Sequence, residues 1–398
     1  MKFGMLPAPY LRSKRSTKKI MLLVTAGIAI VWIASIIYNF SLRSSYGEQA
    51  IMIGLIALIT TLILDAIWAF FRLRPTFQRQ KKFDFKMLLK DILHSYSYVT
   101  ALIFALTIPI GTPIFVVVLG ALVSTAVGKM IFGGFGYNIV NPAAVGRIVV
   151  GLAYPSTLVH YMRDTHIGSV VAGATPTTSM ATNWFSTQLP EGIDSIGQLF
   201  IGNYSGALGE TFTLLLFAIA IIFCVLRVID WRIPTFYLGT IIVSAIAVAV
   251  FKQLNVIDYV LIHLAIGGSA FAAVFMLTDP VTSPTSPYGK IIFAIGAGLI
   301  TFLIRVSGAT PEGVVFSIAV MNLAVPLIDR FIKGRTTDHL GRKAIVTVAL
   351  LLFAALFNVG ILYLKENAGG DSIAYNAYHL VEMPNLTEGI LLEGVMIP

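Results

Sequence analysis

Long apolar runs separated by short polar stretches make up most of this chain. Eleven of these runs approach or reach the ~20 residues that a helix needs to cross a bilayer. They lie near residues 20–41, 50–71, 95–110, 111–128, 140–158, 208–226, 234–251, 259–277, 290–305, 312–329 and 344–364. The pattern predicts an all-α polytopic membrane protein.

Two of the runs, 95–110 and 259–277, are expected to be broken at their ends by proline. The prolines are Pro109 and Pro113 at the first run, and Pro280 and Pro284 at the second. Proline has no backbone N–H and breaks a helix. Because broken backbone at membrane depth must be buried in protein or line a cavity, we expect half-helices or re-entrant segments at both places.

Composition excludes several other classes of protein. Hydrophobic residues make up 57% of the chain and charged residues 12%, whereas soluble domains carry about 25% charged residues. The chain has one cysteine, Cys224. A disulfide scaffold, an iron–sulfur cluster and a cysteine-ligated zinc site are therefore excluded for this chain alone, and no metal site is expected.

The basic residues are distributed unevenly between alternate loops. With the N-terminus inside, 22 of the 28 Lys and Arg residues fall on inner segments and five on outer ones. Because basic loops stay on the cytoplasmic side, the N-terminus is expected in the cytoplasm and the C-terminus outside the cell membrane. Topology accounts for the net charge of +9, so no nucleic-acid partner is expected.

A repeat divides the chain into two halves. Leu106-Thr107-Ile108-Pro109 recurs 171 residues later as Leu277-Thr278-Asp279-Pro280, each followed by a second proline. If each half has five spans, the second must enter the membrane from the opposite side, as inverted repeats do. The expected parts are a cytoplasmic N-terminus (1–19), a first five-helix repeat (20–158), an outer loop (159–207), a second five-helix repeat (208–329), a cytoplasmic loop (330–343), an extra transmembrane helix (344–364) and an outer acidic tail (365–398).

Three stretches depart from ordinary membrane sequence. Gly133-Gly134-Phe135-Gly136-Tyr137-Asn138 runs into Asn141-Pro142, and its glycines favour either tight helix packing or close approach of the backbone to a ligand. Thr278 to Pro284 puts a carboxylate and hydroxyls at a broken helix end. Ala172-Gly173-Ala174-Thr175-Pro176 lies in the outer loop and, taken alone, is a small-residue turn with a hydroxyl.

Asp279 is the main candidate for an ion ligand. A charge at membrane depth costs about 2.5–3.5 kcal/mol and usually persists because it pairs or binds an ion. Its counterpart in the first repeat is Ile108, so the repeat itself does not require a carboxylate. Asp279, Thr278 and Asn141 therefore form a candidate ion pathway. The alternative is that Asp279 caps a helix by accepting hydrogen bonds from backbone amides beyond Pro280.

Motifs spread over residues 7–330 resemble the D subunit of the Rnf complex, the ion-translocating ferredoxin:NAD⁺ oxidoreductase. They are Pro7 to Thr17 with Ile20-Met21, Gly133 to Ala143, Gly209-Glu210-Thr211, Ile229 to Pro234, Thr278 to Pro284 with Gly289-Lys290, and Met321-Asn322-Leu323 with Pro326 to Asp329. The B subunit of the Na⁺-translocating NADH:quinone reductase is a sister family that shares most of them. Its second-repeat loop typically lacks the double Thr-Ser-Pro found at Thr282 to Pro287, so the Rnf resemblance is the stronger.

The resemblance implies an FMN joined through its phosphate to a threonine hydroxyl outside the membrane. The matching residue is Thr175, where Gly173 and Ala174 leave room for a flavin transferase to reach the Oγ atom. It also implies a urea/ammonium-transporter-like fold, surrounding membrane lipid and other Rnf subunits as partners. A noncovalent riboflavin is allowed too, at residues that the sequence does not identify.

The chain departs from the family pattern at several positions. Ala172 stands where the family has Ser or Thr, and Leu23 stands where it usually has Asp. Ser307-Gly308-Ala309-Thr310 spells the flavin consensus better than the Thr175 site does. It lies in a short turn before Pro311, however, which leaves little space for a transferase. Thr175 is therefore the preferred flavin site.

The expected function is that of a flavoprotein subunit that passes electrons through FMN and couples this to Na⁺ or H⁺ movement, with no catalytic residue of its own. The first alternative is a urea- or ammonium-type channel without a redox role, which aligned pore histidines would favour. Only His94 and His263 lie near the spans, and neither belongs to a paired motif. The second alternative is an inert scaffold.

Overall fold

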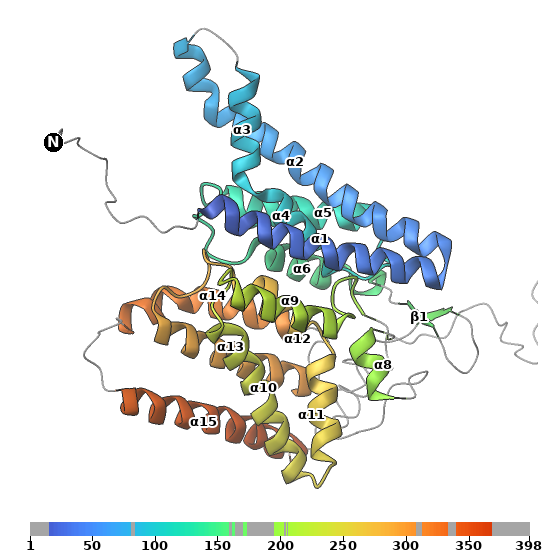
Figure 1. The fold of residues 1–398 in the computed structure, drawn as a ribbon, viewed down its shortest axis with the longest axis vertical. Coiled ribbons are helices and arrows are strands. Elements are labelled where there is room, and N and C mark those ends of the chain that lie inside the picture. Colours follow the sequence, from blue (N-terminus) through green and yellow to red (C-terminus); the bar gives the residue numbers. More distant parts are fainter. Residues whose placement is uncertain are drawn as a thin grey trace, which may run out of the picture.

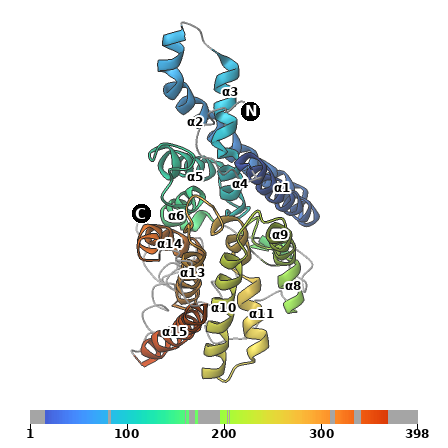
Figure 2. The same cartoon turned by 60° about the vertical axis from the view of Figure 1, so that its left-hand side comes forward.

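The computed structural model shows a protein that is helical over most of its length. It describes residues 16–80, 84–158, 161–163, 170–172, 195–202, 204, 206–307, 313–332 and 340–367. Figures 1 and 2 show two groups of helices, with α1 to α6 in the upper part and α10 to α15 in the lower part. The all-α polytopic class that the sequence predicts is confirmed.

The first group follows the order of the first half of the chain. It contains α1 (Thr17–Leu42), α2 (Ser44–Gln80), α3 (Phe85–Ser95), α4 (Ser97–Leu106), α5 (Ile114–Thr125), the π-helical turn η1 (Ala126–Met130) and α6 (Pro142–Ala153). A 3-10 turn, η2 (Pro155–Thr157), then leads to the antiparallel strands β1 (Tyr161–Arg163) and β2 (Val170–Ala172).

The second group begins after a short helix, α8 (Ile196–Ile201). It contains α9 (Thr213–Val225), α10 (Arg232–Phe251), α11 (Val256–Ala265), α12 (Ser269–Phe271), the π-helical turn η3 (Ala272–Met276), α13 (Pro287–Ser307), α14 (Gly313–Phe331) and α15 (Leu340–Asn367). α15 packs against α10 and α13. Asn358 anchors it, because its side-chain amide donates to the Ser244 hydroxyl of α10 at 3.1 Å.

All eleven predicted runs contain helix, but only some of these helices are long enough to span. Within the described residues, six pass by length and composition: α1, α2, α10, α13, α14 and α15. The pair α11 and α12–η3 makes a seventh if it counts as one span, with a bend of 61° between its parts. α4, α5 with η1, α6 and α9 are apolar but shorter.

Both runs end at the expected prolines, and the second also has a break within it that no proline causes. α4 ends at Leu106, and helix resumes only after Pro113. The α11–α12 break instead falls at Gly267 and Gly268, whose φ angles of 69° and 67° favour glycine. Pro280 and Pro284 lie beyond it, in the 277–286 loop between η3 and α13.

Two expectations about the polar segments are wrong. The stretch 72–90, expected as a loop, is mostly helical, because α2 continues to Gln80 and α3 begins at Phe85. Figure 1 shows α2 and α3 extending beyond the other helices as a hairpin. Lys129 and Arg305, counted as loop charges, are 3% and 2% exposed inside the protein.

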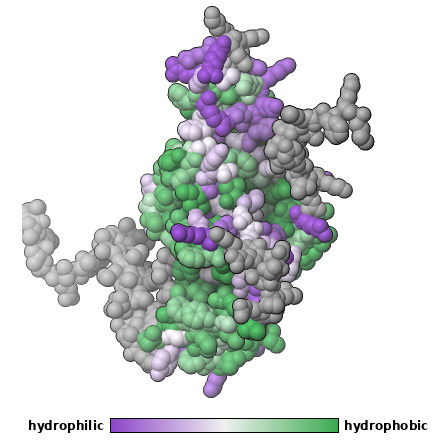
Figure 3. Space-filling view, turned by 90° about the vertical axis from the view of Figure 1, so that its left-hand side faces the viewer, coloured by the Kyte–Doolittle hydropathy of each residue, from purple (hydrophilic) through white to green (hydrophobic). Residues whose placement is uncertain are grey.

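The lateral surface of the protein is apolar. Side chains such as Leu22, Ile63 and Leu356 are more than half exposed, as expected for residues that face lipid. Figure 3 shows hydrophobic residues covering the body of the molecule, and hydrophilic ones gathered over the projecting hairpin. A buried cluster, with Phe104, Tyr237 and Phe293 among its largest members, connects both groups of helices.

The order of elements after the half-helices is similar in the two halves. α4 is followed by a Thr-x-Pro loop and two helices, and so is α12–η3. The start of α14 at Gly313 lies 171 residues after the start of α6 at Pro142, the same offset as between the proline motifs. The inverted orientation of the halves and the transporter-like fold stay predictions.

Candidate functional site: a pocket between the broken segments

A buried arginine occupies the break after α4. The Arg147 side chain on α6 is 2% exposed, and its Nε donates to the Thr107 carbonyl at 2.8 Å. Carbonyls at a helix end lack an intrahelical partner, and no water is available in a bilayer core. The guanidinium therefore stabilises the end of this half-helix.

A second buried arginine holds the break between α11 and α12. Arg305 on α13 donates to the carbonyl oxygens of His263 (2.7 Å), Ile266 (3.2 Å) and Gly267 (3.3 Å). It also donates to the Ser269 hydroxyl at 2.5 Å. The fixed fork of five N–H donors suits such convergent carbonyls.

The segment before α9 joins the two breaks. The amide of Gly209 donates to the Leu106 carbonyl at 2.7 Å, at the end of α4. The neighbouring Glu210 carboxylate lies against Gly268, where an added Cβ would be 2.5 Å from Oε1. Glu210 interacts electrostatically with both Arg147 and Arg305. Gly209-Glu210-Thr211 is one of the motifs that carry the family resemblance, but no local sequence pattern indicates this role.

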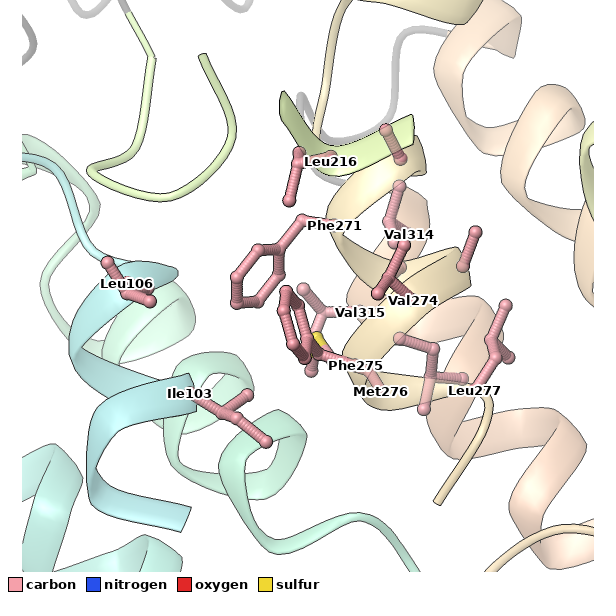
Figure 4. Packing of buried hydrophobic residues seen from close by; sticks show 14 of the residues in the cluster. Ile103, Leu106, Leu216, Phe271, Val274, Phe275, Met276, Leu277, Val314 and Val315 are labelled. Carbon is pink, nitrogen blue, oxygen red and sulfur yellow. The ribbon is translucent and has the colours of Figure 1, made fainter. Parts of the chain in front are cut away.

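Apolar side chains complete the contact between the broken segments. Figure 4 shows Phe271 and Phe275, from α12–η3, pointing toward Ile103 and Leu106 of α4. All four are buried in the common core. The two half-helices therefore share one apolar core, while the inverted repeat stays a prediction.

A pocket opens beside this contact and gathers the predicted ion-pathway residues. Its lining comes from α1, α4, η1, the segment around the 133–141 glycine motif, the α9–α10 link and the 274–281 region. Asn141, Thr278 and Asp279 all line it. Lys129 lines it as well, although the sequence analysis placed that residue in a loop.

Asp279 forms the cap that was considered as the alternative to an ion ligand. Its Oδ1 accepts from the Val281 amide at 3.1 Å, and its Oδ2 accepts from the Thr282 hydroxyl at 3.3 Å. The carboxylate thus stabilises the turn after Pro280 while it lines the pocket. Capping and ion binding are therefore compatible at this residue.

Asn141 and Asn322 connect the two halves beside the pocket. The Asn141 side chain caps α6 by accepting from the Ala143 amide at 3.1 Å, and its Nδ2 donates to the Met276 carbonyl at 3.1 Å. Asn322 on α14 accepts from the Asn141 backbone N–H at 3.0 Å and donates to the Thr282 carbonyl at 2.9 Å. Asn141 therefore has a structural role in addition to its place in the lining.

The glycine motif provides unusual backbone rather than close packing. Gly133, Gly134 and Gly136 have φ angles of 111°, 101° and 92°, which side-chain-bearing residues rarely adopt. The glycine that packs closely against another segment is instead Gly128 in η1, where an added Cβ would be 2.8 Å from the Pro142 Cα.

Residues from other family motifs contact one another near the 277–286 loop. Lys290 on α13 pairs with Asp230, at 3.0 Å between Nζ and Oδ2, although the two lie in separate motifs. Asp329 accepts from the Thr285 amide at 3.1 Å. Asp230 and Lys290, from separate motifs, are thus neighbours in space, and Asp329 of a third motif contacts the 277–286 loop.

The flavin residues fall outside the described part of the chain. β2 ends at Ala172, and Gly173, Ala174 and Thr175 follow it, outside the described residues, as does Thr310. The histidines do not form a pair, since His94 is exposed on α3 whereas His263 is buried between Tyr259 and Phe302. Neither ring nitrogen of His263 has a hydrogen-bond partner within the described residues.

Comparison with known proteins identifies relatives over most of the chain. The model of the NQR2, RnfD, RnfE family matches residues 5–338, so α15 begins just beyond the match. The D subunit of the proton-translocating ferredoxin:NAD(+) oxidoreductase complex of Clostridium ljungdahlii is 30% identical over 335 residues, 83% of this chain and 94% of that protein.

Two further relatives come from the two kinds of complex named above. The D subunit of the Na(+)-translocating ferredoxin:NAD(+) oxidoreductase complex of Acetobacterium woodii is 32% identical, over 82% of this chain and 93% of its own. The B subunit of the Na(+)-translocating NADH-quinone reductase of Pseudomonas paraeruginosa is 36% identical, over 59% of each chain. The resemblance inferred from the motifs is confirmed: the chain belongs to the NQR2, RnfD, RnfE family.

Proposed function

We propose that this chain is the D-type membrane subunit of a redox-driven, ion-translocating electron-transport complex of the Rnf type, and thus part of a translocase. The observation that carries the proposal is the pocket beside the two broken segments, which Asp279 and Lys129 both line and to which several of the family motifs contribute residues. Relatives are named for Na⁺ and for proton translocation, so either cation fits this proposal. Other subunits of the complex supply the electron donor and acceptor sites.

The proposed cofactor is an FMN held covalently on Thr175. A bound flavin supplies one- and two-electron transfer, while the protein supplies position and electrostatics. The support for Thr175 is the Gly-Ala-Thr match and its place in the long segment between η2 and α8. A flavin transferase would form the linkage.

Covalent flavin is the feature that separates this function from a channel or a scaffold. Replacing Thr175 by Ala is expected to abolish the flavin fluorescence of the denatured chain in a gel, and to remove the mass shift on the peptide 164–187. Thr310→Ala is the matched control and should keep both signals. Fluorescence lost only in Thr310→Ala would overturn the site, and a wild-type chain without covalent flavin would refute the covalent FMN.

The same pocket is the proposed place of a noncovalent riboflavin. Tyr96, Phe135 and Phe275 present aromatic surface to it, and the amides of Asn138 and Asn141 provide hydrogen-bonding groups. An isoalloxazine ring has apolar faces and a polar edge, which this lining matches. Thr175→Ala would then still release flavin on denaturation, and a colourless extract from that variant would contradict the assignment.

A further inference from the structure

A series of buried hydrogen bonds connects α2 with the pocket. The Asp65 side chain on α2 is 4% exposed, and its Oδ1 accepts from the Ser97 hydroxyl at 2.9 Å. The Ser95 hydroxyl donates to Asp65 Oδ2 as well. On the other side, Lys129 Nζ donates to the same Ser97 hydroxyl at 2.7 Å and to the Ser95 carbonyl.

Lys129 interacts with two acidic residues. Its ammonium group interacts electrostatically with Asp65, to which Ser97 connects it, and with Asp279, which lines the same pocket. It follows Gly128 in the π-helical turn η1, and such turns are frequent at functional sites. A buried ammonium needs a negative partner, and here two carboxylates are within its electrostatic reach.

We propose that Lys129 is a built-in competitor of the coupled cation, and that Asp65 controls it by holding the ammonium away from Asp279. An ammonium near a carboxylate weakens the binding of any other cation there, whether a proton or Na⁺. When the cation occupies Asp279, Asp65 keeps the displaced positive charge neutralised. This inference rests on the proposed function, because it takes Asp279 as the cation site.

One more charged residue, Asp91, lies near Asp65, on the side toward the surface. Asp91 is the next carboxylate to Asp65, and it is paired with Arg72 on the projecting part of α2. Tyr96 and Asn138 complete the polar groups of the lining on this side. Asp91 is therefore a suitable control position, since it has its own partner and does not line the pocket.

The test measures the electron-transfer rate of the purified complex in liposomes. The rate is recorded against Na⁺ concentration at fixed pH, and against pH at fixed Na⁺, so that the coupled cation is identified by the dependence itself. Lys129→Gln removes the competitor and should raise the apparent cation affinity about tenfold, seen as a lower half-saturating Na⁺ or a higher half-saturating pH. Asp65→Asn frees the ammonium for Asp279 and should lower the affinity by a similar factor.

The double variant tests whether Asp65 acts only through Lys129. In the Lys129→Gln background, Asp65→Asn should change nothing further, because Asp65 acts only through the ammonium. Asp91→Asn should leave the affinity as in wild type. Each variant is checked for a single symmetrical size-exclusion peak and for its flavin content. If Lys129→Gln does not fold, Asp65→Asn alone still gives the expected decrease.

Two kinds of result would overturn these ideas, and they are distinguishable. Equal affinities in wild type and Asp65→Asn, shifts of the same sign in both single variants, or additive effects in the double variant would contradict the role of Lys129. Asp279→Asn, which can still accept the capping hydrogen bonds, should remove the cation dependence. A wild-type dependence in that variant would refute Asp279 as the cation site, and with it the proposed pathway.

Discussion

At the scale of single residues, polar side chains in this protein mostly bind backbone. Arg147 and Arg305 each donate to carbonyls at a helix break. Asn141 donates to the carbonyl at the end of η3, and Asn322 donates to one in the following loop. Leaving such a buried polar group without a partner costs about 1–3 kcal/mol. These residues therefore stabilise a backbone that apolar packing alone could not keep in a membrane.

Gly268 tests this arrangement most directly. It has a φ of 67°, and an added Cβ would be 2.5 Å from Glu210 Oε1. Gly268→Ala is therefore expected to destabilise by at least the roughly 1–2 kcal/mol cost of a left-handed residue, and to lower the midpoint of thermal unfolding in detergent. Gly239→Ala, with no atom within 4 Å of the new Cβ on α10, should be neutral or slightly stabilising. Equal midpoints for the two variants would contradict the role of this break.

The Asp230 carboxylate lies outside the spans, in the link between α9 and α10, and its pairing with Lys290 near the start of α13 gives a pH dependence. Burial alone would raise the pKa of Asp230, but hydrogen bonds from Lys290 and the Arg232 amide, with both positive charges, hold that pKa below its usual value of 3.8. The pair's contribution to stability is therefore fully present above pH 3.8 and is lost as pH falls through the lowered pKa. Wild type should unfold less readily than Asp230→Asn at pH 7, with the difference shrinking below pH 3.8. A difference independent of pH would show that the charge is not responsible.

At the scale of elements, the sequence predicts what depends on local pattern. α1, α10, α13 and α15 follow from uninterrupted apolar runs, because helices that face lipid carry few polar residues. α3 was missed, since its alternation of Lys with exposed Phe85 and Leu89 was hidden in a segment with many charges. The break at Gly267 and Gly268 was not predicted, because glycines in membrane helices are too common to mark a break.

Only those residues of the candidate site that a local sequence pattern marks could be predicted. Asp279, Thr278 and Asn141 stand beside helix-breaking residues, which single them out locally. Lys129 and Asp65 are 64 positions apart, and Ser97 connects them only in three dimensions. Glu210 likewise owes its role to two arginines in distant helices. No spacing rule in one sequence identifies such contacts.

At the scale of the whole molecule, the arrangement of helices is consistent with the predicted sidedness. In Figure 1, α1 and α15 both begin at the left, whereas β1 and α8 lie at the right. The predicted cytoplasmic segments 1–19 and 330–343 directly precede the helices that begin at the left. The predicted outer loop contains β1 and α8.

Cysteine labelling tests this topology. In a background in which Cys224 is replaced by Ser, a membrane-impermeant thiol reagent added outside should modify Asp371→Cys and leave Asp338→Cys unmodified. Permeabilised cells should show modification at both positions, which controls for the reactivity of each cysteine. Outside labelling of position 338 but not of position 371 would reverse the orientation and place the Thr175 loop in the cytoplasm.

The guanidinium contacts at the α11–α12 break have a mechanical consequence. Arg305 is fastened to three successive parts of the break, and its planar fork can bind one set of acceptors at a time. Gradual sliding of α12–η3 past α13 would break these hydrogen bonds before new ones formed, so intermediate positions are high in energy. Any movement of this half-helix past α13 would therefore be stepwise, from one set of acceptors to another, rather than gradual.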